Sequence, residues 1–186
     1  METSIVIAGF GGQGVLLAGQ VLAYAAMDYG RYVTWIPSYG PEMRGGTANC
    51  TVIISEQPIG APIVAHLEIA LVLNRPSFDK YEPFVRPGGL LLVNSSLVAV
   101  QTTRADIECV YVPANDVATK WGTDKMLNMA MLGALVAKRP ILPLTTIEQA
   151  LTNHLPTDKA HLLAANLQVL RRGYESVHPE TETMLK

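Results

Sequence analysis

Cysteine is scarce in this sequence of 186 residues, which contains only Cys50 and Cys109. A cubane iron–sulfur cluster requires four cysteine thiolates, so this chain cannot ligate such a cluster by itself. The two cysteines lie far apart, and each stands within a strand-like apolar run. We therefore expect two buried structural thiols and a cytoplasmic protein.

Charge is also sparse. Charged residues make up 16% of the sequence, the formal net charge is -2, and there is no basic run. This composition argues against nucleic acid or an anionic membrane surface as a partner. The chain starts with Glu2 and no positively charged region, and its first long apolar run contains Gly19 and Gln20 and ends at Asp28. We expect neither a signal peptide nor a membrane span.

The usual sets of catalytic side chains are missing as well. Serines near predicted turns have no evident base partner, no pair of carboxylates stands at a strand end, and no Gly-Lys-Ser follows the first glycine turn. The histidines show no paired spacing on one helix face; they are His66, His154, His161 and His178. The sequence thus predicts no catalytic residue and no metal ligand, which leaves a binding or docking role.

A glycine turn near the start organises the chain. Residues 5–8 form a short apolar run, and Gly9, Gly11 and Gly14 then fit the G-x-G-x-x-G pattern that follows the first strand of a βαβ unit. Glycines at this spacing allow a tight turn, a close approach of backbone to ligand, and close packing of helix on strand. Free N–H groups and the helix dipole favour an anion there.

A dinucleotide site would need a carboxylate at the end of the second strand, which we place at residues 32–36. That strand ends in Pro37-Ser38-Tyr39, without a carboxylate. This counts against bound NAD, although a free-standing dinucleotide-binding oxidoreductase remains an alternative. A structural scaffold whose glycines serve only packing is another.

The second strand leads into residues 37–49, the longest irregular segment of the first half. The segment is rich in Gly and Pro yet carries Tyr39, Glu42, Arg44 and Asn49, so function is expected here. The first two strands of a βαβ unit end on the same edge of the sheet, so we expect Arg44 to lie near the glycine turn. With no helix in between, residues 50–55 are expected to return antiparallel.

The remaining pattern predicts a three-layer α/β fold with a mostly parallel, mixed sheet, helices on both faces and a Rossmann-like start. Further strands are expected at 69–73, 90–93 and 108–112, and an apolar helix at 126–138, buried by the domain or by a partner. We expect Gly30 to end the first helix, and expect helix starts at Asp124, at Thr145 or Thr146 with Glu148, and at Asp158. A single domain would span 1–175, followed by a polar tail at 176–186.

Two longer motifs carry a resemblance to a known family. Gly9-Phe10-Gly11-Gly12-Gln13-Gly14 and Ser38-Tyr39-Gly40-Pro41-Glu42-Met43-Arg44-Gly45-Gly46 resemble the two signatures of the gamma subunit of 2-oxoacid:ferredoxin oxidoreductases. Asn128-Met129-Ala130-Met131-Leu132-Gly133-Ala134 and the stretch from Asn166 to Gly173-Tyr174-Glu175 match as well. Together these matches extend over nearly the whole chain.

The resemblance implies a complex in which alpha and beta subunits, and in some enzymes a ferredoxin-like delta subunit, hold thiamine diphosphate with Mg and iron–sulfur clusters. Such a complex converts a 2-oxoacid and CoA to acyl-CoA and reduces ferredoxin. The gamma chain would bind no cofactor alone but would help to hold CoA. The implied binding residues are Gly9, Gly11, Gly12, Gln13, Gly14, Ser38, Tyr39, Glu42, Arg44, Gly45 and Gly46.

The form of the second signature favours 2-oxoglutarate as substrate, with 2-oxoisovalerate, pyruvate and indolepyruvate enzymes as alternatives. Apolar residues make up 49% of the sequence. A gamma subunit separated from its partners would therefore expose apolar surface, and we expect the isolated chain to form a homodimer.

Overall fold

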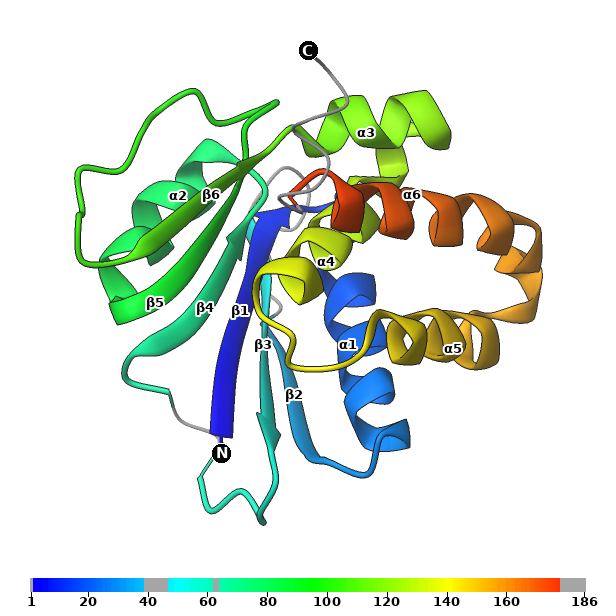
Figure 1. Ribbon diagram of the computed structural model, residues 1–186, viewed down its shortest axis with the longest axis horizontal. Helices are drawn as coiled ribbons and strands as arrows, with labels where there is room; N and C mark the ends of the chain where they lie inside the picture. Colours follow the sequence, from blue (N-terminus) through cyan, green and yellow to red (C-terminus); the bar gives the residue numbers. More distant parts are fainter. Residues whose placement is uncertain (1, 39–46, 62–63, 178–186) are drawn as a thin grey trace.

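The computed structural model describes residues 2–38, 47–61 and 64–177, and it shows one sheet with helices on both faces (Figure 1). The strand order is β2-β3-β1-β4-β5-β6. Only the β1–β3 and β2–β3 pairs are antiparallel, so β3 alone runs against the other strands. The strands are β1 (Glu2–Phe10), β2 (Tyr32–Ser38), β3 (Thr47–Ser55), β4 (Leu67–Val72), β5 (Val85–Asn94) and β6 (Glu108–Val112). The predicted α/β class and the antiparallel return are confirmed.

The two faces of the sheet follow from alternation along the strands. Ile5 and Ile7 of β1 point into the larger core, which includes the helix α1 (Val15–Asp28), whereas Val6 points into a smaller core with Phe78 of α2 (Arg75–Tyr81). The larger core also holds α3 (Ala114–Trp121), α4 (Leu127–Lys138), α5 (Leu144–His154) and α6 (Leu163–Glu175). The predicted apolar helix is α4. It is almost wholly buried, and α3 and α6 pack against it within this chain.

The prediction for the end of α1 is also confirmed. Gly30 has φ +79, and its N–H donates to the carbonyl of Met27 (2.9 Å), while the N–H of Arg31 donates to the carbonyl of Ala26 (2.9 Å). This is the Schellman arrangement, in which a glycine takes the left-handed position after the last helical turn.

The predictions for the other helix starts are wrong. Short 3₁₀ turns at Asp124–Met126 and Thr157–Leu162 precede α4 and α6, so neither Asp124 nor Asp158 acts as a side-chain cap. Each 3₁₀ turn continues directly into its helix, so the residue before the helix is the last residue of the turn, Met126 or Leu162, which has no capping side chain.

The helix α5 starts at Leu144 directly after Pro143, and Glu148 pairs with Arg171 of α6 (2.6 Å) instead of closing a capping box. The last helix runs from Leu163 through Gly173 to Glu175. The strand β5 begins at Val85, before the predicted 90–93.

Candidate functional site

The carboxyl ends of β1 and β4 form the point where the connections of the fold diverge. From β1 the chain crosses over α1 toward β2, whereas from β4 it crosses over α2 toward β5, on the opposite face (Figure 1). In open α/β sheets, ligands bind outside the carboxyl ends of strands at such a switch point. The glycine turn after β1 lies at this edge.

The second predicted motif begins and ends at the same edge. Phe10 at the end of β1 pairs with Thr47 at the start of β3, and Ser38 at the end of β2 pairs with Asn49. The structure thus brings Ser38 and the glycine turn to one edge of the sheet. The other predicted residues of this motif lie outside the described residues; they are Tyr39, Glu42, Arg44, Gly45 and Gly46.

Within the glycine turn, the left-handed positions are Gly12 (φ 94) and Gly14 (φ 72). A side chain at either position would strain the backbone. Gly14 is the N-cap of α1, which has no side-chain cap and no acidic residue in its first turn. The first N–H groups of a helix lack partners inside the helix, so this helix start is suited to an anion. Gly11 and Gly12 are exposed beside it.

Gln13 folds back over its own turn. Its Oε1 accepts a hydrogen bond from the backbone N–H of Phe10 (2.6 Å), and its Nε2 makes a longer one to the carbonyl of Leu73 (3.5 Å). A Cβ atom on Gly9 would lie 2.6 Å from Gln13 Oε1 and 3.0 Å from Leu73 Cβ. The space that Gly9 leaves open is therefore filled by side chains of this chain.

Three asparagines continue from Gln13 along the carboxyl edge. Asn74 donates from Nδ2 to Gln13 Oε1 (3.4 Å) and caps α2 through Oδ1, which accepts the N–H of Ser77 (2.9 Å). Asn94 donates from Nδ2 to the carbonyl of Leu73 (3.2 Å) and to Oδ1 of Asn115 (2.8 Å). We call Gln13, Asn74, Asn94 and Asn115 the amide row.

The amide row links the segments at the ends of β1, β4, β5 and β6, and its asparagines are not among the site residues predicted from the sequence. Asn74 and Asn94 are almost completely buried. The only signal in the sequence is that each asparagine stands at the end of an apolar strand or just after one. Amides donate and accept hydrogen bonds but carry no charge, so the row can orient polar groups without neutralising a phosphate.

The helix α4 also reaches the glycine turn. Asn128 donates from Nδ2 to the carbonyl of Gly14 (3.0 Å), and a Cβ on Gly14 would lie 2.4 Å from that nitrogen. The last glycine of the pattern therefore makes room for α4. This contact joins the start of α4 to the glycine turn.

Neither cysteine is placed as a nucleophile. Burial raises the pKa of the Cys50 thiol to about 11, and burial also raises the pKa of Cys109. Cys50 is fully buried as predicted, whereas Cys109 is only half-buried. Thiols with raised pKa values stay protonated near neutral pH and are poor nucleophiles.

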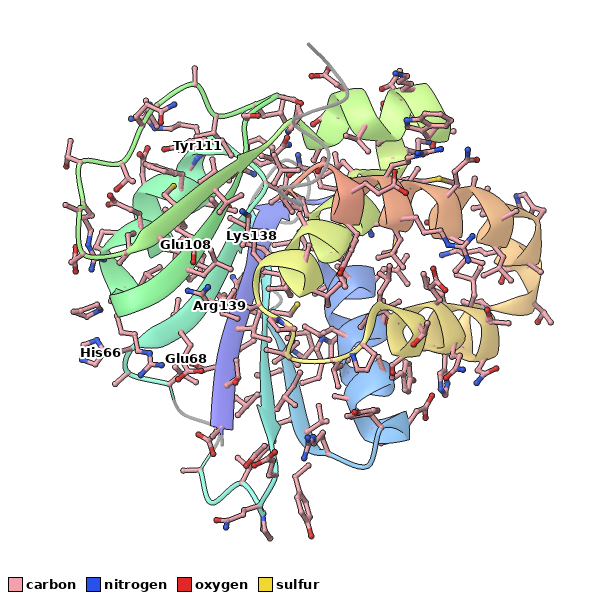
Figure 2. All side chains as sticks on the ribbon, in the orientation of Figure 1. His66, Glu68, Glu108, Tyr111, Lys138 and Arg139 are labelled. Atoms are coloured by element: carbon pink, nitrogen blue, oxygen red, sulfur yellow. The ribbon has the colours of Figure 1, made fainter. Side chains whose placement is uncertain are left out.

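Tyr111 of β6 (Figure 2) accepts a hydrogen bond at its hydroxyl from the N–H of Thr102 (2.9 Å), and burial is the main cause that raises its pKa to about 12.

Across residues 2–38, 47–61 and 64–177, no group of three or more His, Cys, Asp or Glu side chains could hold a metal ion. In the same ranges, no helix has the length and apolar character needed to cross a membrane.

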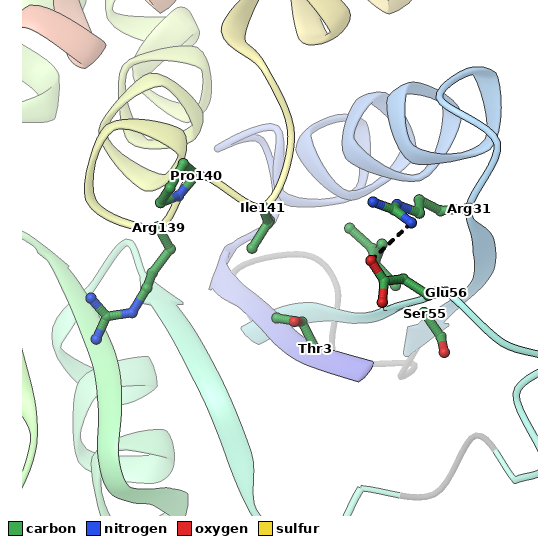
Figure 3. Close-up of a pocket in the computed structure, with 8 residues that line it drawn as sticks. Thr3, Arg31, Ser55, Glu56, Arg139, Pro140 and Ile141 are labelled. Atoms are coloured by element: carbon green, nitrogen blue, oxygen red, sulfur yellow. Dashed lines mark ion pairs between the residues drawn. The ribbon is translucent and has the colours of Figure 1, made fainter. Parts of the chain in front are cut away.

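A hollow of about 320 Å³ lies at the opposite end of the strands from the glycine turn, next to the start of β1 (Figure 3). Its apolar part includes Ile54, Pro140 and Ile141. Arg31 pairs with Glu56 (3.0 Å), and Arg139 pairs with Glu108 of β6 (2.6 Å; Figure 2). Because both arginines are paired with carboxylates, this hollow offers no net positive charge to an anion.

Known proteins of similar sequence fall into two length classes. The ketoisovalerate oxidoreductase subunit VorA of Methanothermobacter thermautotrophicus is 38% identical over 178 residues, which cover 94% of this chain but 36% of VorA. The chain thus spans about a third of that relative. The 2-oxoglutarate synthase subunit KorC of Methanocaldococcus jannaschii is 34% identical over 180 residues, which cover 94% of each chain.

A solved structure agrees with these relatives. The gamma subunit of a keto/oxoacid ferredoxin oxidoreductase from Geobacter sulfurreducens PCA superposes with a TM-score of 0.82 at 30% identity, covering 95% of this chain and 96% of that one. The resemblance to gamma subunits that the two motifs predicted is therefore confirmed. The family model for pyruvate ferredoxin/flavodoxin oxidoreductase matches residues 4–176, and this chain belongs to that family.

Proposed function

We propose that this chain is the gamma-type subunit of a cytoplasmic 2-oxoacid:ferredoxin oxidoreductase, and that it helps to bind CoA and to assemble the complex. One observation carries the proposal. The chain matches 94% of the length of KorC and 96% of the Geobacter gamma subunit, but only about a third of VorA. The matched region therefore corresponds to a separate subunit in some of these enzymes and to one part of a longer subunit in others.

Alpha and beta subunits would hold the thiamine diphosphate, Mg and iron–sulfur clusters, which supply decarboxylation and electron transfer to ferredoxin. A ferredoxin-like delta subunit is a further candidate partner. This chain contributes backbone N–H groups at the start of α1 and the uncharged amide row. Such groups bind and orient a substrate, and they cannot carry electrons or form a covalent intermediate.

CoA fits the carboxyl edge by its chemistry. The uncapped start of α1 suits one of its phosphates. The charge would come from Arg44, since an arginine binds phosphate through a planar fork of N–H groups. Support comes from the strand pairing, because Ser38 and Thr47, which flank residues 39–46, both lie at this edge.

The proposed 2-oxoacid is 2-oxoglutarate, because KorC, which is matched over 94% of its length at 34% identity, is named a 2-oxoglutarate synthase subunit. Relatives named for ketoisovalerate and for pyruvate make 2-oxoisovalerate and pyruvate the alternatives. A free-standing dinucleotide-binding protein is not favoured, since β2 carries no carboxylate from Tyr32 to Ser38 and Gln13 fills the turn.

Purification of the tagged chain from its native host tests the subunit assignment. We expect larger chains with iron–sulfur absorbance to co-purify and to reduce a viologen dye in the presence of a 2-oxoacid and CoA. The chain alone, supplied with thiamine diphosphate, is expected to be inactive. Steady turnover by the chain alone, or its purification without partners, would contradict the assignment.

Replacement of Arg44 by alanine in the whole complex tests the CoA site. We expect the Michaelis constant for CoA to rise by about tenfold or more, for a loss of ~1.5–3 kcal/mol. The constant for the 2-oxoacid and the CoA-independent decarboxylation should stay near the wild-type values. Arg31→Ala is the matched control, because Arg31 lies in the hollow at the opposite end of the strands. An unchanged CoA constant in an intact Arg44→Ala complex would remove Arg44 from the site.

A further inference from the structure

The two outermost strands of the sheet, β6 and β2, differ in how their unpaired sides are protected. The edge strand β6 has five residues and begins with Glu108, which pairs with Arg139. The other edge strand, β2, has seven residues, Tyr32–Ser38, and none of them is charged. Proteins usually blunt an edge with short strands, charges or bulges. The strand β2 has none of these three features, although Pro37 near its end lacks a backbone N–H.

Large uncharged side chains lie beside the β2 edge on both faces of the sheet. Val33 and Trp35 face α1, so the exposed Tyr32 and Ile36 point to the other face. We define the β2 patch as the exposed large side chains of β2 and of α1 with its end. Its members, with exposed fractions, are Tyr24 (38%), Met27 (53%), Tyr29 (47%), Tyr32 (50%) and Ile36 (42%). Tyrosine and methionine are enriched at the centres of protein interfaces, and lysine and glutamate are depleted there.

The rim of the β2 patch is polar. Asp28 of α1 pairs with His154 of α5 (2.9 Å), and Arg31 pairs with Glu56 (3.0 Å). A shallow groove of about 190 Å³ opens between α1 and β2 and is lined by Gln20, Ala23, Tyr24, Met27, Val33 and Trp35. An apolar centre with a polar rim is the usual anatomy of a protein interface.

We propose that the β2 patch binds a second copy of this chain, with the two β2 strands pairing antiparallel across a twofold axis into one continuous sheet. A twofold contact places the same surface against itself, so like charges on it would repel. The strand β2 avoids this repulsion because it carries no charge. Pairing would also satisfy backbone N–H and C=O groups on the outer side of β2.

The area of the patch is adequate for a dimer. An aromatic side chain contributes roughly 150–250 Å² when it is buried completely, so side chains that are about half exposed leave on the order of 400 Å² per copy. Two copies would remove on the order of 800 Å² from these side chains alone, and the strand edge and the groove bring the total toward the ~1,000 Å² that a specific interface should exceed.

The oligomeric state of the whole chain tests this inference, measured by light scattering and sedimentation from about 1 to 100 µM. We expect a dimer for the wild type. Ile36→Lys and Tyr32→Lys should raise the dissociation constant at least about tenfold, because each dimer would then have to bury two new charged side chains in the contact. The matched control is Leu97→Lys, which changes a side chain of similar exposure (48%) outside the patch and should leave the dimer intact.

Met27→Lys gives an independent test, because Met27 lies on α1 and its substitution leaves the β2–β3 ladder untouched. It should weaken the dimer while the circular dichroism and melting temperature stay as in the wild type. A wild type that is monomeric at the highest concentration would overturn the inference, as would a dimer that survives all three patch variants. If the patch variants instead lose only the co-purifying larger subunits, the β2 patch binds a different chain and the self-pairing is wrong.

Discussion

At the scale of single residues, Gln13 shows how a side chain can serve its own turn. The Gln13 side chain joins the N–H of Phe10 on one strand to Leu73 and Asn74 after another. Gln13 therefore helps to determine the shape of the glycine turn. A direct contact between Gln13 and CoA remains a prediction.

Replacement of Gln13 by alanine should expose the N–H of Phe10 to exchange. Loss of one hydrogen bond of about 1 kcal/mol predicts roughly fivefold faster amide exchange at Phe10. Gln13→Glu keeps an acceptor for that N–H, so exchange should change less. In the full complex, Gln13→Glu should raise the CoA constant more than Gln13→Ala, because a carboxylate at the turn would repel phosphate. Amide exchange at Phe10 can be measured by nuclear magnetic resonance. Equal rates in the wild type and both variants would refute the hydrogen bond between Gln13 and this N–H.

Cys50 predicts a dependence of stability on pH. Its pKa is raised from 9.0 to about 11 in the folded chain, so between these values the unfolded chain loses a proton that the folded chain keeps. The free energy of unfolding should therefore be unaffected by this thiol well below pH 9 and fall above it, by about 1 kcal/mol per pH unit in that range.

The measurement is urea unfolding at several pH values between about 8 and 10, below the range where the raised pKa of Tyr111 adds its own effect. Cys50→Ala is the control, and its curve should be flatter over the same range, whatever the packing cost of the substitution. Parallel curves for the two proteins would show that Cys50 does not cause the decline.

At the scale of elements, α4 and α6 cross with their backbones in direct proximity. A Cβ on Gly133 would lie 2.0 Å from the carbonyl oxygen of Leu170, and one on Gly173 would lie 2.1 Å from that of Ala130. These glycines therefore explain two of the motifs that revealed the family. They allow α6 to cover α4, and α4 in turn holds Asn128 against the glycine turn.

Gly133→Ala should open this crossing. Because the atoms it meets are backbone, neither helix can yield by a rotamer change, and we expect a loss of ~3 kcal/mol or more in the free energy of unfolding. Gly60→Ala is the matched control, since no atom lies within 4 Å of the added methyl group. Its effect in urea unfolding should stay within about 1 kcal/mol. Similar losses in both variants would argue against the close crossing.

At the scale of the whole molecule, α6, which ends at Glu175, is the last helix within the described residues. Among the described residues, which end at 177, Val177 still packs against the larger core. The sequence after it is mostly polar. A division into one domain over 1–175 and a tail over 176–186 stays a prediction.

Removal of residues 178–186 should leave the melting temperature of the isolated chain unchanged. The control removes residues 163–186 and with them α6, which should abolish cooperative unfolding because α6 covers the buried helix α4. Differential scanning calorimetry distinguishes the two. A large drop in melting temperature for the shorter deletion would extend the domain beyond its predicted end.

The sequence by itself determined the class of the fold, because that information is local. Apolar runs such as 5–8 and 90–93 indicate buried strands whatever their neighbours are. The absence of a helix before residues 50–55 was sufficient to predict the reversed strand β3. The motifs also determined the family, since their residues are close together in sequence.

Only the tertiary structure decided what those motif residues contact. Two partners of Gln13, Leu73 and Asn74, stand 60 and 61 positions away, and Asn128 is 114 positions from Gly14, so no local pattern could reveal these contacts. Helix starts were mispredicted because 3₁₀ turns and a proline replaced the side-chain caps. The position of β2 at the edge of the sheet could not be predicted from the sequence either, because it depends on the order of all the strands.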